Sequence, residues 1–169
     1  ERLAGAFGKA MVAELALKLN PNRTLAIDCE DKKMIYFSEK FEFAATHKLW
    51  NEQFTTEQNF EAFGKCANPA GHGHNYLLEV AIKAPQGAGD IRVGEYEEVV
   101  EREFIGVVDH KNLNVDVGFF AEAIPSVENI AVFAWERLDG KFGKAKLHCV
   151  TVWETDRTYC TYYGQPGEV

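Results

Sequence analysis

Two long extended segments with side chains of alternating character constrain this chain more than any other feature. In a β-strand, successive side chains point to opposite faces, so residues two apart share a face. His72 and His74, at the start of the second segment, therefore leave the same side of their strand. One face of the first segment carries the row Phe41, Phe43, Ala45 and His47. If the two strands are neighbours, the histidines at their ends can meet.

The periodicity of apolar residues predicts the other elements. Residues 2–19 have apolar side chains at four-residue steps, which predicts a helix ending before Pro21. A second helix buries a face from Tyr96 to Val108, and a third begins at the N-cap Ser126. Strands are expected at residues 23–29, 33–43, 74–84, 147–154 and 157–163, and a polar loop with one helical turn at residues 50–71. The order helix, strand, strand at residues 2–43 recurs at residues 127–163, which fits either a degenerate duplication or a common arrangement.

The composition excludes several classes of protein. With 46% hydrophobic and 26% charged positions among 169 residues, the chain can fold as a globular domain. A net charge of −8, from 18 Lys and Arg against 26 Asp and Glu, makes a nucleic-acid partner unexpected. No stretch approaches the roughly 20 apolar residues of a membrane helix, and no signal-peptide pattern is present, so we expect a cytoplasmic protein without a membrane partner. The four cysteines lack the CxxC spacing of a zinc knuckle.

Three histidines are candidate metal ligands. His47 ends the first extended segment and would reach His72 and His74 if the two strands pair. Three neutral imidazoles without a fourth protein ligand describe an open zinc site, in which water or substrate takes the remaining position. The pair His72 and His74 alone fits equally well two histidines that make ordinary hydrogen bonds. Gly71 and Gly73 would let another group approach the rings closely.

A cysteine in the polar loop is a candidate base or nucleophile. Cys66 lies six residues before His72, and the adjacent Lys65 together with a nearby metal ion would lower the pKa of its thiol. The alternative is a small buried side chain. Cys29, Cys149, Cys160 and His148 lie in apolar strand segments, where a structural role is expected.

Three carboxylates stand at the ends of predicted elements. Asp109 precedes His110 at the end of a helix, where it could orient an imidazole that transfers protons; stabilisation of that histidine by the helix dipole is an equal alternative. Glu154 ends an apolar strand beside Trp153 and could bind a guanidine-like edge through two parallel hydrogen bonds, or begin a turn. Glu128 first complements a helix dipole, with ligand binding as a second interpretation.

Five motifs together resemble the family of 6-pyruvoyl-tetrahydropterin and 6-carboxytetrahydropterin synthases. They are FAATH at residues 43–47, FGKCANPAGHGHNY at 63–76, VDHKNLN at 108–114, PSVEN at 125–129 and WETD at 153–156. The resemblance covers residues 34–163 and implies an α+β tunnelling fold (T-fold), a four-stranded antiparallel sheet with helices packed on one face. In this family the strands close into a barrel in a homo-oligomer, a trimer or hexamer with active sites between subunits. Residues 1–33 would then be a helix-and-strand extension, an embellishment or the remnant of a duplicated half-domain, and residues 164–169 a frayed C-terminal tail.

The resemblance also implies a role for each candidate residue. One group would bind Zn²⁺: His47, His72 and His74. A second would transfer protons, with Cys66 as the base and Asp109 and His110 as the relay. A third would bind substrate, with Glu154 anchoring the pterin ring, Glu128 beside it, and Lys65 and Lys111 offsetting the charge of a triphosphate.

The substrate that this resemblance implies is 7,8-dihydroneopterin triphosphate. The product would be 6-pyruvoyl-tetrahydropterin, formed with loss of triphosphate and without a redox cofactor. The five residues between Cys66 and His72 resemble the spacing of the pyruvoyl-forming enzymes and favour them over 6-carboxy-5,6,7,8-tetrahydropterin synthase of queuosine biosynthesis, which also releases acetaldehyde. Two further interpretations stay open: a non-catalytic pterin-binding protein, and a closed structural site with Cys66 as fourth zinc ligand.

Overall fold

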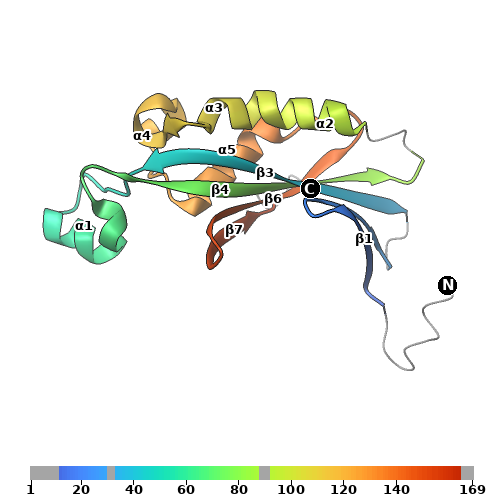
Figure 1. The fold of residues 1–169 in the computed structure, drawn as a ribbon, viewed down its shortest axis with the longest axis horizontal. Helices are drawn as coiled ribbons and strands as arrows, with labels where there is room; N and C mark the ends of the chain where they lie inside the picture. The colour runs from blue at the N-terminus through green and yellow to red at the C-terminus, as the bar shows by residue number, and fades with distance from the viewer. Residues whose placement is uncertain (1–11, 30–32, 88–91, 165–169) are drawn as a thin grey trace.

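A single antiparallel sheet carries the fold. The computed structural model describes residues 12–29, 33–87 and 92–164, and within them six strands lie in the order β1-β2-β3-β4-β6-β7 (Figure 1). These strands are β1 (Glu14–Asn20), β2 (Arg23–Asp28), β3 (Met34–His47), β4 (His72–Pro85), β6 (Lys146–Thr155) and β7 (Thr158–Tyr162). The short β5 (Lys111–Asn112) pairs in parallel with β3 at Ala45 and Thr46. The part of the sheet from β3 to β7 is the expected four-stranded unit, and β1 and β2 extend it.

The strands β3 and β4 form the long axis of the molecule. They pair without interruption from Met34 opposite Pro85 to His47 opposite His72, and Figure 1 shows them spanning the sheet. The alternation that predicted these strands is visible in their burial, because Tyr76, Leu78 and Val80 on β4 are buried while the residues between them are not. The condition set by the sequence analysis, that the two strands are neighbours, is therefore met, and the pairing brings the histidines of both strands to one end.

Helices cover one face of this sheet. The longest is α5 (Val127–Leu138), and α1 (Thr56–Phe63) and α2 (Val93–Val100) have eight residues each. The shorter elements are η1 (Gly64–Ala67), η2 (Glu101–Ile105), α3 (Gly106–Val108), α4 (Leu113–Asp116) and η3 (Gly118–Ala121). The Tyr96 hydroxyl of α2 donates to the Val80 carbonyl of β4 at 2.6 Å. Trp135 of α5 packs edge-on against Tyr162 of β7. The core lies between the helices and this face, as the α+β expectation required.

One helix contains an irregular turn that the sequence did not indicate. Residues 93–108 form the predicted helix, but η2 in its middle is a π-helical turn, in which the chain makes one wider loop of backbone. At Gly106 a Cβ atom would stand 3.2 Å from the Glu101 carbonyl oxygen, so glycine permits the close approach. Beyond the π turn the helix ends at Asp109, whose N–H donates to the Ile105 carbonyl.

The helix predicted for residues 2–19 is wrong where the structure describes it. Residues 14–20 form β1, paired with β2 from Glu14 opposite Asp28 to Asn20 opposite Arg23. The spacing of Leu15 and Leu19 fits a helix, but Leu17 between them completes a period of two, and the strand satisfies the backbone by pairing. Residues 2–11 of that predicted helix lie outside the described residues. In the suggested internal duplication, residues 14–20 therefore form a strand where the first copy was expected to have a helix.

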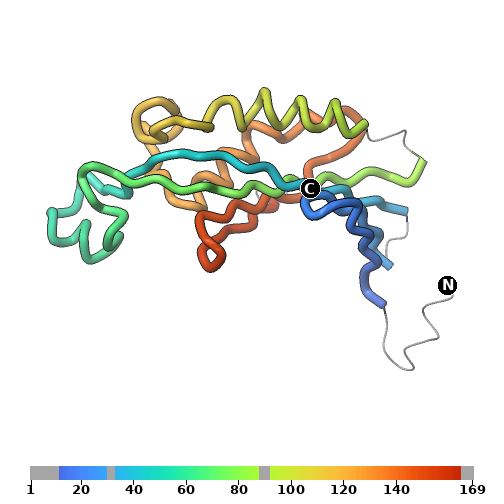
Figure 2. The backbone as a smooth tube through the Cα atoms, in the orientation of Figure 1, coloured from blue at the N-terminus to red at the C-terminus, as the bar shows by residue number. Residues whose placement is uncertain are grey.

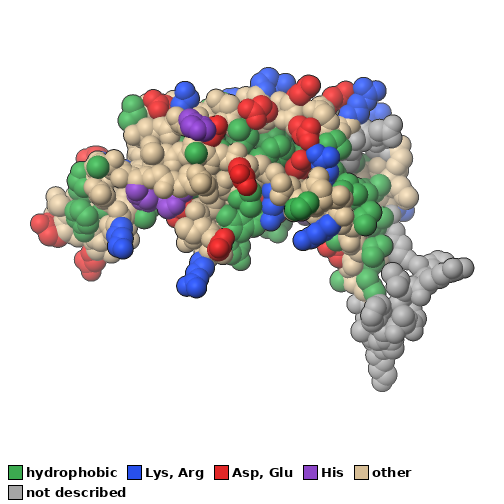
Figure 3. Space-filling view, viewed as in Figure 1, with side chains coloured by type: hydrophobic (Ala, Val, Ile, Leu, Met, Phe, Trp, Pro, Cys, Tyr) green, Lys and Arg blue, Asp and Glu red, His purple; other side chains and the backbone are tan. Residues whose placement is uncertain are grey.

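The hairpin β1–β2 bends away from the long β3–β4 ribbon, as Figure 2 shows. On β1, Leu15, Leu17 and Leu19 are each more than half exposed, and Figure 3 shows hydrophobic side chains at the surface over β1 and β2. The predicted turn at residues 30–32 and the tail at residues 165–169 lie outside the described part of the chain. Among the described helices, none combines the length and the apolar character needed to cross a membrane.

The loop between β3 and β4 contains the helical turn that was expected there. Thr55 caps α1 by accepting a hydrogen bond from the Gln58 N–H, and the Gln58 side chain returns to the Thr55 N–H. The Leu49 N–H then donates to the Cys66 carbonyl at 2.9 Å. This bond ties η1, which carries Cys66, to the end of β3. At the start of α5, Ser126 caps the helix by accepting from Asn129 N–H, as predicted.

Candidate active site and metal centre

Three imidazoles converge at the end of the β3–β4 ribbon. His47 is the last residue of β3 and lies opposite His72, while His74 lies opposite Ala45 and shares a face with His72. One ring nitrogen from each histidine lies within 4.8 Å of the others, and Nε2 of His47 is 3.2 Å from Nε2 of His72. In Figure 3, histidine side chains gather at this end of the sheet. The structure therefore brings together the three residues that the sequence nominated as metal ligands.

The surroundings of His47 determine where its proton lies. The side chain is fully buried, and Nδ1 is 2.7 Å from the carbonyl oxygen of Pro125. A carbonyl only accepts, so Nδ1 carries the proton and Nε2 offers a lone pair to the cluster. Burial is the main cause that lowers the pKa of His47 to about 4, and the charges of His72 and His74 act in the same direction. At neutral pH this ring is uncharged, the form that binds metals.

The donor atoms of the cluster fit a metal ion. Two ring nitrogens, Nδ1 of His72 and Nε2 of His74, are buried and have no hydrogen-bond partner. Buried polar atoms are almost always satisfied, so Nε2 of His74 points to a missing partner in the cluster. In His72 it is Nε2 that faces His47, and Nδ1 is the other nitrogen of that ring. Gly71, with φ +69°, lets the chain before β4 lie close to the end of β3. A Cβ atom at this position would stand only 2.9 Å from the His47 carbonyl oxygen. These features support the expected metal site; the identity of the metal stays a proposal.

The buried neutral state of His47 predicts a pH-dependent stability of the metal-free protein. In the unfolded chain a histidine has a pKa of about 6.5. Between pH 6.5 and about pH 4, the unfolded chain binds a proton at His47 that the folded chain does not bind. This contribution to stability is therefore complete above pH 6.5 and is lost as the pH falls to 4, by at most about 3 kcal/mol.

The measurement is the free energy of unfolding in urea between pH 7.5 and 4.5, with a chelator present and at one protein concentration. His47→Asn is the comparison, because its amide can still donate to the Pro125 carbonyl. The pKa values of His74 and His148 are lowered too, chiefly by burial, so the wild-type curve contains their contributions as well. The variant should lose less stability on acidification than the wild type. Parallel curves would contradict the assignment.

A carboxylate and a thiol lie beside the three imidazoles. Glu154, near the end of β6, places Oε1 3.3 Å from His47 Nε2 and 3.6 Å from His74 Nε2. The pKa of the Cys66 thiol is raised, first by burial and second by the charge of Glu154. The protein's own groups therefore act in the upward direction, because Lys65 is exposed to solvent while burial and the nearer carboxylate act directly on the sulfur. The lowering expected from Lys65 together with a metal ion stays a prediction. Cys66 makes no contact with the imidazoles among the described hydrogen bonds.

Asp109 and His110 form a pair beside Ala44 of β3, next to the short strand β5. The Ala44 N–H donates to Asp109 Oδ1 at 2.8 Å, and the His110 N–H donates to the Ala44 carbonyl at 2.6 Å. The other carboxylate oxygen of Asp109 accepts from His110 Nδ1 at 2.7 Å. The hydrogen bond from Ala44 and, less strongly, that from His110 lower the pKa of Asp109, so it stays ionised and orients the imidazole.

His110 adopts a conformation that non-glycine residues seldom take. Its φ is +56°, and its ring is 82% exposed. Left-handed backbone of this kind costs about 1 kcal/mol and is often retained at functional sites. His110 and Lys111 line an open depression of about 490 Å³ together with Gly73 and His74. No described contact of Asp109 or His110 reaches Cys66, so a single chain does not assemble the predicted relay.

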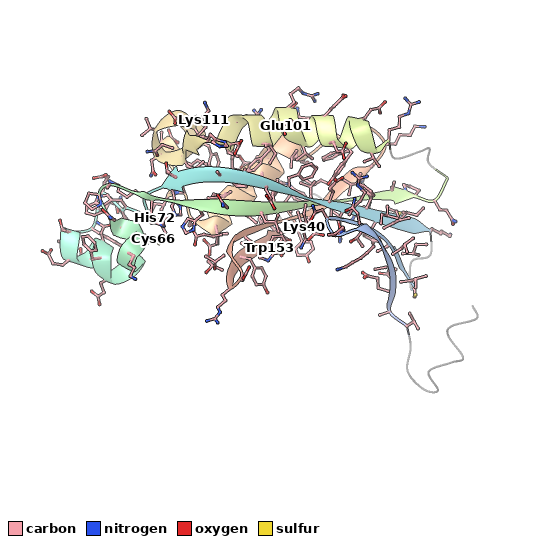
Figure 4. All side chains as sticks on the ribbon, in the orientation of Figure 1. Lys40, Cys66, His72, Glu101, Lys111 and Trp153 are labelled. Carbon is pink, nitrogen blue, oxygen red and sulfur yellow. The ribbon has the colours of Figure 1, made fainter. Side chains whose placement is uncertain are left out.

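The remaining predicted site residues lie apart from the cluster. In Figure 4, Cys66 and His72 lie at the end of the sheet beside α1, whereas Lys111 lies on the side of β3 that carries α3 and α4. Lys65 is exposed on η1. Glu128 is exposed in the first turn of α5, where its charge helps to raise the pKa of Cys160. None of these three has a described contact with the histidines.

Two groups at the site were missed by the sequence analysis. The buried Tyr76 hydroxyl is 3.3 Å from His47 Nδ1, and its pKa is raised, first by burial and then by Glu154 and Cys66. Its position could have been found, because Tyr76 follows His72 and His74 at the same two-residue spacing. The second group is the backbone carbonyl of Pro125, which orients His47. No pattern of side chains in the sequence could indicate this contact.

Known proteins resemble this chain over the part that holds the site. Residues 36–165 match the family described as 6-pyruvoyl tetrahydropterin synthase. Human 6-pyruvoyl tetrahydrobiopterin synthase is 34% identical over 131 residues, covering 76% of this chain and 90% of the human protein. An Aquifex aeolicus protein named 6-carboxy-5,6,7,8-tetrahydropterin synthase is 27% identical over 160 residues, covering 74% of this chain and 95% of that protein.

A solved structure agrees with the sequence match. The structure of Caenorhabditis elegans 6-pyruvoyl tetrahydropterin synthase superposes with a TM-score of 0.70 at 30% identity, covering 78% of this chain and 96% of that one. The T-fold inferred from the sequence is therefore confirmed for the chain, and its matched segment contains the sheet from β3 to β7 except for the first two residues of β3. On this evidence the chain belongs to the 6-pyruvoyl tetrahydropterin synthase family.

Proposed function

We propose that this protein is a zinc-dependent lyase that converts 7,8-dihydroneopterin triphosphate to 6-pyruvoyl-tetrahydropterin with loss of triphosphate. The observation that carries the proposal is the convergence of three imidazoles, a carboxylate and a thiol in a chain of this family. Apart from the lost triphosphate, substrate and product have the same composition, so oxidation of the side chain balances reduction of the ring. The residues needed are therefore ones that bind, orient and move protons.

The three histidines would hold the metal. His47 presents Nε2 as a neutral ligand because Pro125 accepts the Nδ1 proton, and His74 Nε2 lacks any other hydrogen-bond partner. A bound zinc ion would supply Lewis acidity towards the side-chain hydroxyls of the substrate. All three are nitrogen ligands, which zinc accepts readily.

Proton transfer falls to Cys66 and to the pair of Asp109 and His110. Burial and the charge of Glu154 raise the pKa of the Cys66 thiol, so the protein without substrate keeps it protonated at neutral pH. When Glu154 pairs with the guanidine-like edge of a pterin, its charge is compensated and the thiolate becomes easier to form. Cys66 would then accept a proton from the substrate side chain, and His110, oriented by Asp109, would exchange protons as triphosphate leaves.

A homo-oligomer would complete the site. Asp109 and His110 lie across β3 from the β4–β6 side that carries Glu154, so a neighbouring copy is the simplest source of the relay facing Cys66. Lys111 would accompany His110 into that site, and Lys65 would stand beside Cys66, where both can offset triphosphate charge. Glu128 is assigned to the rim of the pterin pocket.

The test is identification of the product by mass spectrometry. Zinc-loaded protein is incubated with 7,8-dihydroneopterin triphosphate without oxygen, and the pterin products and triphosphate are measured. We expect 6-pyruvoyl-tetrahydropterin. A 6-carboxy product with acetaldehyde would instead assign the alternative that the Aquifex aeolicus relative's name suggests, 6-carboxy-5,6,7,8-tetrahydropterin synthase. Pterin binding without any product would support the non-catalytic interpretation.

A further inference from the structure

A stretch of sequence near the start of the chain recurs near its end. Residues 1–10 read ERLAGAFGKA and residues 136–145 read ERLDGKFGKA, so eight of ten positions are identical at an offset of 135 positions. This alignment places β1–β2 on β6–β7. It replaces the comparison of residues 2–43 with residues 127–163, which rested on the order of elements alone. A repeat this close indicates that the two segments have a common origin.

The two hairpins have the same pairing register at this offset. All five residue pairs of β6–β7 have counterparts in β1–β2, 135 positions earlier. Val152, for example, lies opposite Cys160 in β6–β7, and its counterpart Leu17 lies opposite Leu25 in β1–β2. The register of each hairpin also shifts at the equivalent place, just before its first strand ends. Because related structures keep such irregularities, β1–β2 is a structural copy of β6–β7.

The exposed leucines of β1 have buried counterparts in β6. Leu15 and Leu17 are 53% and 59% exposed, whereas Val150 and Val152 are fully buried in the core that α5 helps to form. Figure 3 shows the hydrophobic side chains at the surface over β1 and β2. Exposed apolar patches mark surfaces that another element covers. The repeat indicates that the element covering these leucines is a counterpart of α5.

The contact between β2 and β3 is specific. The two strands pair antiparallel from Arg23 opposite Glu39 to Ile27 opposite Ile35. The Arg23 guanidinium donates two hydrogen bonds to Glu39, at 2.8 and 3.0 Å, and a third to Glu97 of α2. Glu39 is buried, and a buried carboxylate is costly without such a partner. The edge of β3 is therefore built to receive β2, although the family match leaves β2 outside.

We propose that β1–β2 is the last hairpin of a complete T-fold unit that precedes residues 34–164 in the same polypeptide, and that the pairing of β2 with β3 joins the two units into one sheet. The preceding unit would repeat this one at a period of about 135 residues. Its counterpart of α5 would cover Leu15 and Leu17. Its counterpart of β4 would pair with the outer edge of β1, as β4 pairs with β6 here.

The same repeat assigns a partner to β7. In the described part of the chain, β7 ends the sheet, and it corresponds to β2 at the offset of 135 positions. The β3 strand of a further unit is therefore expected to pair with β7 as β3 pairs with β2, which places Thr161 opposite Tyr36 of that unit. The first unit of a second polypeptide would supply this strand. Tandem chains would then join end to end through the same contact that joins their units.

The first test is the coding sequence upstream of Glu1. We expect the upstream sequence to match the family that residues 36–165 match, with its strands about 135 positions before their counterparts in this chain. A reading frame that begins close to Glu1 would overturn the proposal. So would an upstream sequence that does not match this family.

The second test is the accessibility of β1 in the protein translated from the complete reading frame. Leu17→Cys and Asn22→Cys are labelled with a maleimide in the 169-residue chain and in the complete protein. Unsubstituted proteins give the background from the native cysteines. Leu17→Cys should react at least about tenfold more slowly in the complete protein, because a buried thiol reacts only when the structure opens locally. Asn22 and its counterpart Arg157 are both exposed, so Asn22→Cys should react equally in both proteins.

The outcomes are independent of the proposed function. Slower labelling of Leu17→Cys, with Asn22→Cys unchanged, would support the joined units. Equal labelling of Leu17→Cys in the two proteins would overturn the proposal even if the upstream sequence matches the family. Slower labelling of both variants would also contradict it, because the turn at Asn22 is expected to stay exposed. Neither test measures metal binding or turnover, so a failure here leaves the proposed lyase activity standing.

Discussion

Replacement of Cys66 by Ala is expected to abolish turnover of 7,8-dihydroneopterin triphosphate while the fold and the metal remain. A positioned base accelerates proton transfer by about 10²- to 10⁴-fold, so kcat should fall by that factor. KM should change little, because the ring edge, the hydroxyls and the phosphates are assigned to other groups. The measurement is steady-state formation of the pterin product by the zinc-loaded variant.

The matched control is Cys149→Ala. Cys149 lies on β6, and burial together with Glu79 raises the pKa of its thiol to about 11, so it is not a usable base at neutral pH. This variant should retain wild-type kinetics. Wild-type activity in Cys66→Ala would refute the assigned role. Loss of zinc from Cys66→Ala would point instead to the closed site in which the thiolate is a ligand, and a zinc–sulfur distance of about 2.3 Å by X-ray absorption would identify it.

A mixture of two inactive variants is expected to recover activity if neighbouring copies share each site. Cys66→Ala and His110→Asn would each be inactive alone, and Asn is chosen because it tolerates the positive φ of residue 110. In mixed oligomers, about a quarter of the sites join an intact Cys66 from one copy to an intact His110 from another. Activity per chain should therefore reach about a quarter of the wild-type value in an equal mixture.

The control mixture combines Cys66→Ala with His72→Asn. Because both positions serve the same side of the chain, every site in these mixed oligomers lacks at least one group, and activity should not return. Co-expression with two different tags and native mass spectrometry would establish that mixed oligomers form. Verified mixed oligomers of Cys66→Ala and His110→Asn that stay inactive would contradict a shared site, and so would equal recovery in the control mixture.

The strands that carry the site were predictable because their signal is local. The alternation that ends in His47, and the spacing of His72 and His74, required only that neighbouring side chains in a strand point to opposite faces. Burial and pairing in β3 and β4 follow that rule. The same kind of evidence failed at residues 14–20, where Leu15 and Leu19 satisfied a helical spacing and a strand spacing together. Pairing with β2, a tertiary effect, decides between them.

The contact between Glu154 and the histidines could not be read from the sequence. It depends on the register of β6 against β4, in which Trp153 lies opposite Leu77 after a shift at Ala81 and Ile82. A shift of one residue would turn Glu154 to the other face of the sheet. The charge that raises the pKa of Cys66 could not be foreseen either, because Glu154 is 88 positions away in the sequence. The lowering expected from Lys65 together with a metal ion stays a prediction.

The π turn η2 imposes a length requirement on the helix that precedes Asp109. An α-helix advances about 100° and 1.5 Å per residue. Deleting one residue from the regular turns of α2, which cannot take up the change, would rotate everything beyond it by that angle, so the carboxylate of Asp109 would swing away from the Ala44 N–H, whereas a deletion within the wide turn would only restore regular winding. Exchanging an exposed side chain such as Arg102 leaves this geometry intact. In this segment the number of residues, more than their identity, sets the direction in which the imidazole of His110 faces.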